Sequence, residues 1–173
     1  MQMSDQKEIA ADPATVYAAL LTPDVLKACV PGAQEVTGTP ADGFEATVTQ
    51  KVGPVKATFK GQVTLSDLAE NQKLTISGEG KGGAAGFAKG GAVVTLLPSE
   101  TGTLLSYEVE AKVGGKLAQL GSRIIDGFAK KMADQFFANL QAHLSPEDEA
   151  GEDGEAVEEG GKKGWFSKVT GRG

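Results

Sequence analysis

The sequence predicts an α+β domain in which a curved antiparallel sheet wraps around one long C-terminal helix. Two patterns lead to this prediction. Between residues 43 and 113, apolar and polar residues alternate in successive segments, as expected for strands with one buried and one solvated face. Across residues 114–144, apolar residues recur at spacings of three and four, which is one face of an α-helix. This apolar stripe consists of Leu117, Leu120, Ile124, Phe128, Met132, Phe136, Leu140 and Leu144.

The predicted C-terminal helix is long for a domain of this size. About 30 residues at 1.5 Å each span roughly 45 Å, so the sheet has to curve to cover the stripe. A sheet wrapped around one helix often leaves a cavity between the two layers. The other side of the helix carries charges at spacings of three and four, which predicts solvated, mutually paired side chains. These charged residues are Arg123, Asp126, Lys130 and Asp134.

One strand and two short helices are predicted ahead of the main sheet. The strand covers residues 3–11. Asp12 before Pro13 indicates a helix start, because the carboxylate can accept free N–H groups and proline suits the first helical position. A second helix is predicted from Pro23 to Cys29, and the Pro-Gly pair that follows ends it.

Five further strands are predicted, at residues 43–52, 55–66, 72–79, 85–97 and 103–113. A Gly-Pro pair at 53–54 makes the turn between the first two. Gly61 stands on the inward row of the second of these strands and predicts a bend or a bulge. In the last strand the alternation places Tyr107 inward and Glu108 and Glu110 outward.

The charged residues divide the chain into three parts. Residues 1–144 carry 15 acids and 13 bases and are predicted to form the folded domain. Residues 145–161 hold eight acids and no bases, and their glycine-rich composition predicts a disordered linker. Residues 162–173 hold four bases and no acids, so the chain ends in a basic tail.

The basic tail combines lysines with aromatic side chains, which suits the interface of an anionic bilayer. We predict that it anchors the domain to a membrane, weakly and reversibly, because stable attachment takes two signals. The alternatives are a motif that docks on a protein partner and a solvated end without function. The predicted anchoring residues are Lys162, Lys163, Trp165, Phe166, Lys168 and Val169.

Composition excludes several classes of protein. The net charge of −6, with no basic stripe across the strands, argues against nucleic acid as a partner. No segment reaches about 18 continuous apolar residues, so no membrane-spanning helix is predicted. The N-terminus lacks the pattern of a secretory signal. A single cysteine, Cys29, cannot form an internal disulfide and fits a reducing cytoplasm, where we expect the protein.

Catalytic and metal-binding patterns are absent from the sequence. One histidine and one cysteine cannot assemble the usual zinc site, and His143 is expected at the frayed end of the last helix. Cys29 lies in an apolar turn and is expected to be a small buried side chain rather than a nucleophile. We therefore predict a protein that is not an enzyme, with no metal and no covalently bound cofactor.

A glycine-rich segment covers residues 78–91. Gly78, Gly80 and Gly83 match the spacing of a dinucleotide-binding loop, but the segment leads into a strand instead of the required helix. We predict a hairpin whose glycines adopt positive φ angles and leave room beneath it. Such a flap is either a ligand portal beside an apolar cavity or an ordinary turn, and the pattern does not separate the two.

Four strings resemble the carbon monoxide dehydrogenase G-subunit family, in one order over roughly residues 3–144. They are VPGA at 30–33, VGPVKATFKG at 52–61, the glycine-rich segment up to Lys89, and VGGKLAQLGSR at 113–123. The resemblance implies a START-like helix-grip fold and an accessory role without a CO-oxidising centre. It also implies recruitment of a molybdenum CO dehydrogenase, or a related hydroxylase, to the inner face of the cytoplasmic membrane, and a quinone as candidate ligand.

A pocket for a long apolar ligand, quinone or lipid, is predicted between the sheet and the last helix. Many inward strand positions are small, so the space under a curved sheet is not filled from that side. The Tyr107 hydroxyl could orient a quinone carbonyl there. The alternative is that the facing side chains meet in a dry core. The predicted ligand-binding residues are Phe59, Phe87, Tyr107, Leu120, Ile124, Phe128 and Met132.

Two other functions compete with the accessory role. A small enzyme could use the same cavity, with Tyr17, Tyr107 or an inward glutamate as its titratable group. A carrier of lipids or other hydrophobic small molecules would need no oxidoreductase partner.

Overall fold

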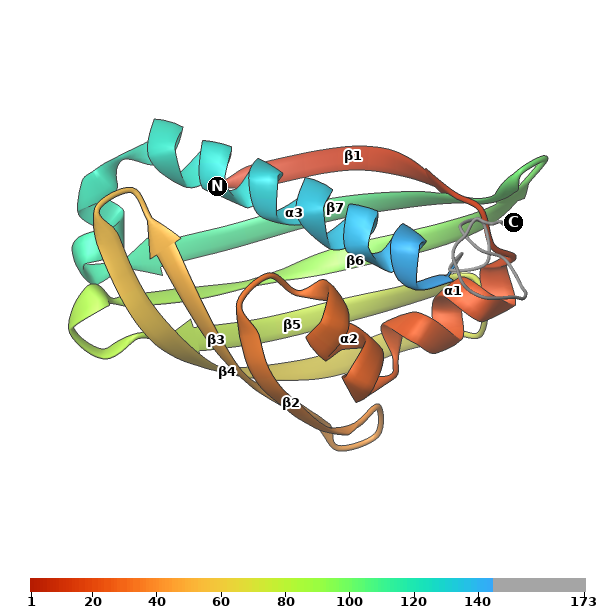
Figure 1. The fold of residues 1–173 in the computed structure, drawn as a ribbon, viewed down its shortest axis with the longest axis horizontal. Helices are drawn as coiled ribbons and strands as arrows, with labels where there is room; N and C mark the ends of the chain where they lie inside the picture. Colours follow the sequence, from red (N-terminus) through yellow and green to blue (C-terminus); the bar gives the residue numbers. More distant parts are fainter. Residues whose placement is uncertain (145–173) are drawn as a thin grey trace, which may run out of the picture. The chain divides into compact units, whose positions relative to one another are not determined.

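Seven antiparallel strands form one curved sheet in the computed structural model, which describes residues 1–144 (Figure 1). The chain runs from strand to neighbouring strand through hairpins, except that the first strand joins the sheet beside the last. The predicted α+β class is confirmed. In spatial order the strands are β1 (Gln2–Ile9), β7 (Gly102–Gly114), β6 (Phe87–Ser99), β5 (Lys73–Lys81), β4 (Val55–Ala69), β3 (Gly43–Val52) and β2 (Ala33–Thr39).

Strand β2 was not among the predicted strands. It lies at the edge of the sheet and pairs only with β3, so most of its side chains are exposed and show no apolar alternation. Of the bend or bulge predicted at Gly61, the bulge is absent. The pairing of β4 with both neighbours runs through Gly61 without a shift, and the irregularity in β4 lies between Ser66 and Ala69, where Asp67 has a positive φ of 50°.

Helices α1 (Pro13–Leu20) and α2 (Pro23–Cys29) each start with a proline in the first turn, as the sequence predicted. The Asp12 carboxylate makes no side-chain cap to the helix backbone. It accepts a hydrogen bond from the Thr15 hydroxyl instead. Helix α1 buries Val16 and Tyr17 and so ties this segment to the core.

The long C-terminal helix is shorter than predicted. Residues Gly115–Leu120 form a 3₁₀ helix, η2, and the α-helix α3 covers Ser122–Leu144. Gly115 and Gly121 have φ angles of +70° and +89°, which an α-helix cannot contain, so the backbone turns on both sides of η2. Because α3 starts later and in a new direction, Ile125 is buried and Ile124 is 43% exposed.

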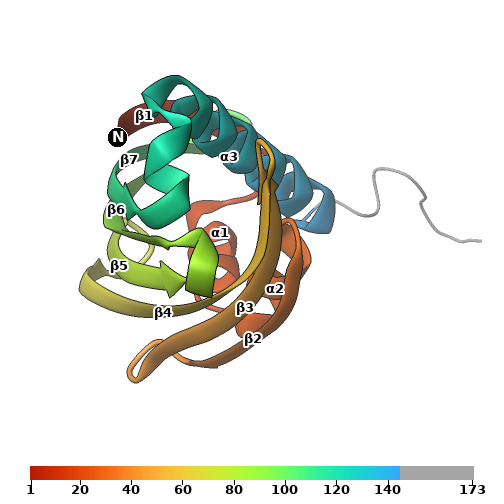
Figure 2. The ribbon, with the colours of Figure 1, turned by 90° about the vertical axis from the view of Figure 1, so that its left-hand side faces the viewer.

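Helix α3 runs along the concave side of the sheet (Figure 2). Contacts near both ends of the helix hold it there. At the start of α3, Val52, Leu117 and Ile125 form a buried cluster. Towards its C-terminal end, Leu140 is completely buried, and the Asn139 amide donates a hydrogen bond of 2.9 Å to the carbonyl of Cys29. The sheet contributes Ile9, Leu74, Leu96 and Leu105 to the fully buried core.

Candidate functional site

The inner face of the sheet is lined by small residues along its middle. Gly78 pairs with Gly90, and Gly90 pairs with Ala111, so three neighbouring strands present almost no side-chain bulk in this row. A Cβ on Gly90 would come within 2.1 Å of the Glu110 carbonyl oxygen, so no larger residue fits this backbone approach. Other inward positions are equally small, namely Ala46, Gly61, Gly80, Ala88 and Ala92.

Larger apolar side chains of the sheet and of α3 remain only half-buried. Val63 and Ile76 belong to the sheet, and Phe128, Met132 and Phe136 belong to α3. In a close-packed core such residues would be almost fully buried, as Leu105 and Leu140 are. The middle of the inner face is therefore apolar, shallow on the sheet side and partly accessible to solvent.

Tyr107 projects from β7 towards α3. It is 4% exposed, and its ring stacks on Phe137 with the two ring centroids 5.4 Å apart. Its hydroxyl is a buried side-chain polar atom that makes no hydrogen bond within residues 1–144. Burial, with a smaller contribution from the negative charge of Asp5, raises the pKa of Tyr107, so the hydroxyl stays protonated and able to donate.

Two charged residues of the edge strand lie on the same face as Tyr107. In the β1–β7 register, Asp5 is opposite Tyr107 and Lys7 is opposite Leu105. The Lys7 ammonium contacts Asp134 of α3 at 2.7 Å and Asp5 at 3.7 Å. Lys130 contacts Asp134 at 2.9 Å, which confirms one of the pairs predicted on that helix face. Arg123 and Asp126, the other two predicted residues, form no ion pair within residues 1–144.

The hydrogen bond to Asp134 raises the pKa of Lys7, and hydrogen bonds from Lys7 and Lys130 lower the pKa of Asp134. Sequence analysis missed the contribution of β1 and of Phe137. The alternation of β1 is too weak to show which side faces inward, and Phe137 stands next to the predicted stripe at Phe136.

The seven predicted ligand-binding residues fall into three groups. Phe59, Leu120 and Phe128 pack against the cluster at the start of α3. Tyr107 and Met132 lie farther along the inner face, where Tyr107 meets Phe137. The structure thus brings Phe59, Leu120 and Phe128 together at one cluster, whereas Tyr107 contacts Phe137, which was not predicted.

The remaining two of the seven, Ile124 and Phe87, lie at the surface, 43% and 41% exposed. The β6 register is unbroken from Phe87 to Ser99, and Val94 is buried on the inner face, so Phe87 lies on the outer face. This differs from the prediction that Phe87 contributes to the inner wall. Its ring covers Gly114, where an added Cβ would come within 2.2 Å of the ring.

The glycine-rich segment forms the predicted hairpin. Strands β5 and β6 are joined through a short 3₁₀ helix, η1 (Gly83–Ala85), and Gly83 and Gly86 have positive φ angles of 60° and 114°. A Cβ on Gly82 would lie 2.4 Å from the Phe59 ring, so this ring fills the space beneath the hairpin.

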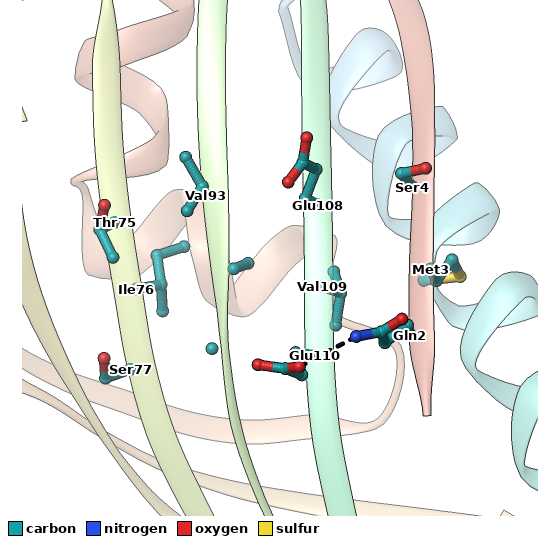
Figure 3. Close-up of a pocket in the computed structure, with 12 residues that line it drawn as sticks. Gln2, Met3, Ser4, Thr75, Ile76, Ser77, Val93, Glu108, Val109 and Glu110 are labelled. Carbon is teal, nitrogen blue, oxygen red and sulfur yellow. Dashed lines mark hydrogen bonds between the residues drawn. The ribbon is translucent and has the colours of Figure 1, made fainter.

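The outer face of the sheet carries a separate hollow of about 550 Å³ (Figure 3). It is lined by Gly91, Ala92 and Val93 of β6 and by residues of β1, β5 and β7, most of them polar. Gln2 donates a hydrogen bond of 3.0 Å to Glu110 across one side. None of the seven predicted ligand-binding residues lines this hollow, and two exposed glutamates, Glu108 and Glu110, make it unsuited to an apolar ligand.

Within residues 1–144, no group of three or more histidine, cysteine, aspartate or glutamate side chains could hold a metal ion. Burial raises the pKa of the Cys29 thiol, which suits a structural side chain and not a nucleophile. In the same part of the chain, no helix has the length and hydropathy needed to cross a bilayer. The predicted linker and basic tail, including the six anchoring residues, lie outside the described residues.

Comparison with known proteins identifies similar families and folds. The sequence pattern of the family described as the G subunit of carbon monoxide dehydrogenase (CoxG) matches residues 6–145. A conserved protein from Geobacillus kaustophilus has a TM-score of 0.79 at 25% identity, with 85% of this chain and 97% of that chain covered. A START superfamily protein from Mycobacterium smegmatis has a TM-score of 0.64 at 15% identity, covering 84% of this chain and 97% of that chain.

A protein from Mesorhizobium loti has a TM-score of 0.62 at 20% identity, with 84% of this chain and 98% of that chain covered. Curated protein sequences give no match. These structural neighbours, one of them a START superfamily protein, share the fold of this chain, and the predicted helix-grip fold is confirmed.

Proposed function

Since the chain belongs to the carbon monoxide dehydrogenase G-subunit (CoxG) family, we propose that it is a non-catalytic accessory protein of a molybdenum CO dehydrogenase or related hydroxylase. In this proposal it recruits the enzyme to the inner face of the cytoplasmic membrane, where its basic tail binds anionic lipid, and it carries a quinone or another apolar lipid. The observation that supports ligand binding is the buried Tyr107 hydroxyl, which has no partner within the described residues.

The proposed ligand lies between the small-residue row of the sheet and α3. A buried hydroxyl without a hydrogen bond is costly, and a ligand carbonyl would remove that cost. Met132 and Phe128 would contact the apolar part of the ligand, with Phe59 and Leu120 towards the start of α3. A quinone offers both the carbonyl and the apolar chain that such a space selects.

Substitution of Tyr107 by phenylalanine tests the proposed ligand site. The full-length protein is purified under mild conditions, extracted with organic solvent and analysed for quinones and lipids by mass spectrometry. We expect the wild type to carry such a ligand and Tyr107→Phe to lose about 80–90% of it, because one hydrogen bond contributes about 1 kcal/mol, a factor of roughly five to ten. In protein freed of ligand, the melting temperature of Tyr107→Phe should not fall below that of the wild type, since only an unpartnered hydroxyl is removed.

Tyr17→Phe is the matched control, because Tyr17 is also buried but belongs to α1. It should retain the ligand. Wild-type protein without any extractable apolar ligand, or equal retention in both variants, would contradict the proposed site.

A carrier of hydrophobic molecules without an oxidoreductase partner is the second candidate, and the START superfamily fold favours it. Capture of the full-length protein from a native lysate separates the two. A molybdenum hydroxylase in the captured material supports the accessory role, whereas retained lipid without that enzyme supports the carrier.

A further inference from the structure

In residues 1–144, basic and acidic side chains are concentrated at opposite ends of the strands. Three segments, residues 51–60, 81–89 and 112–123, contain eight of the 13 bases of residues 1–144 and none of the acids. They form the β3–β4 turn, the β5–β6 hairpin and the connection from β7 to α3, all at one end of the sheet (Figure 2). We call this the basic end. Its bases are Lys51, Lys56, Lys60, Lys81, Lys89, Lys112, Lys116 and Arg123, all of them exposed.

The opposite end of the strands is acidic. Residues 8–24, 39–45, 66–72 and 97–103 form its turns and helix α1, and they hold eight acids and no bases. The net charge of the whole chain, −6, hides this separation. An anionic surface would attract one end of the domain and repel the other, so it would orient the domain.

The bases of the basic end are unpaired within the described part of the chain. The ion pairs formed there involve Lys7 and Lys130, which lie outside the three segments. Two acids border the basic end on the sheet: Glu79 is opposite Lys89 in the strand register, and Glu110 stands two residues before Lys112. Neither forms an ion pair in the described part of the chain. The eight positive charges are therefore free to interact with an external anion.

Apolar side chains are exposed among these bases. Ile124 follows Arg123 and reaches the β3–β4 turn, with its Cγ2 3.7 Å from the position of a Cβ on Gly53. Phe87 is opposite Lys81 in the register. Both are more than 40% exposed, and exposed apolar groups ringed by lysines are typical of surfaces that enter a bilayer interface.

We propose that the basic end is a docking surface for anionic phospholipid headgroups, with Ile124 and Phe87 entering the interface. The proposal rests on the proposed function in one respect, namely that the domain works at a membrane, and it adds a contact independent of the tail. Seven of the eight bases are lysines. Protein interfaces are depleted in lysine and enriched in arginine, so this composition favours mobile lipid phosphates over an acidic protein.

Charge reversal with a matched control tests the docking surface. Lys56→Glu, Lys116→Glu and Arg123→Glu are combined in one full-length variant. The control combines Lys27→Glu, Lys73→Glu and Lys131→Glu, which are equally exposed, lie outside the three segments and change the net charge by the same amount. Both carry Trp165→Ala and Phe166→Ala, so that the tail does not mask the effect.

Binding is measured to vesicles of phosphatidylcholine with about one third phosphatidylglycerol. The parent protein carries only Trp165→Ala and Phe166→Ala. We expect the basic-end variant to bind the vesicles about 100-fold more weakly than this parent, since each base near an anionic surface contributes a factor of roughly five. The vesicle affinity of the control variant should change by less than about threefold. Ile124→Ser should weaken vesicle binding more than Leu97→Ser, because Leu97 is an exposed leucine at the end of β6 that lies away from the basic end.

Equal losses in the two charge-reversal variants would overturn the proposal, since net charge would then explain binding. Unchanged vesicle binding by the basic-end variant, combined with lost binding to a purified molybdenum hydroxylase, would also overturn it and assign the surface to a protein partner. Quinone extraction from the same variants keeps the two proposals separate, because a ligand retained without vesicle binding leaves the proposed ligand site standing.

Discussion

The Asp134 carboxylate accepts hydrogen bonds from two ammonium groups, that of Lys7 on β1 and that of Lys130 on its own helix. Because these hydrogen bonds lower its pKa in the folded protein, the pair stabilises the fold above the carboxylate's ordinary pKa of 3.8. That stability is lost as the pH falls through the lowered pKa. Both partners are partly exposed, so the effect is small.

We expect Asp134→Asn to lower the melting temperature slightly at pH 7 and to make it fall less between about pH 5 and pH 2 than in the wild type. Thermal unfolding followed by circular dichroism across this range measures both effects. Asp126→Asn is the control, since Asp126 lies exposed on the same helix and forms no ion pair in the described part of the chain. Identical pH profiles for Asp134→Asn and the wild type would refute this role.

Individual residues also show where sequence patterns stop being sufficient. The alternation of β7 correctly placed Tyr107 inward and Glu108 outward, because burial on one face selects apolar residues at every second position. Phe87 was assigned to the pocket as part of the glycine-rich hairpin, and this prediction was wrong, because its ring covers Gly114 on the outer face. At the end of a strand, a local contact can hold an apolar side chain on the outer face, and the periodicity of the sequence does not show this.

Glycine has opposite effects in a strand and in a helix of this domain. Gly90 lies where a Cβ would meet backbone, whereas Gly127 of α3 has open space around it. We expect Gly90→Ala to destabilise the protein by about 1–3 kcal/mol through the steric clash. Gly127→Ala should stabilise it by about 0.5–1 kcal/mol by lowering the entropy of the unfolded chain.

Urea unfolding of the two glycine variants measures these free energies. A stabilising Gly90→Ala would show that the backbone at β6 and β7 can separate without cost.

The helices and long strands were predictable from periodicity because each has a buried face. The break at Gly121 was not, since the apolar spacing continues across it while the backbone takes a left-handed angle.

The core of the domain is closed at one end and looser in the middle. Leu140 is completely buried, whereas Met132, two turns earlier on α3, is half-buried opposite the small-residue row. In protein freed of lipid we expect Leu140→Ala to cost about 2–5 kcal/mol and Met132→Ala less than about 1.5 kcal/mol. Chemical denaturation compares the two. A similar loss for both would mean that the inner face is a dry, close-packed core, the alternative that the sequence left open.

The arrangement of the whole domain followed from the order of the elements and the length of the last apolar stripe. The inward direction of β1 was not predictable, because its inner positions hold charged residues and not core residues. Lys7 forms an ion pair with Asp134, and Asp5 is opposite Tyr107 in the register. The basic end was also invisible in the chain's net charge, since its lysines come from three segments that only the fold brings together.

The pairing of β1 with β7 has a consequence for the order in which the protein forms. Strands β2 to β7 can pair as soon as each hairpin has been synthesised, whereas β1 is made first and finds its partner about 100 residues later. Until then β1 has no partner strand and β6 has an open edge. Incomplete chains therefore expose an unpaired strand, and completion of β7 is the step that removes this hazard during synthesis.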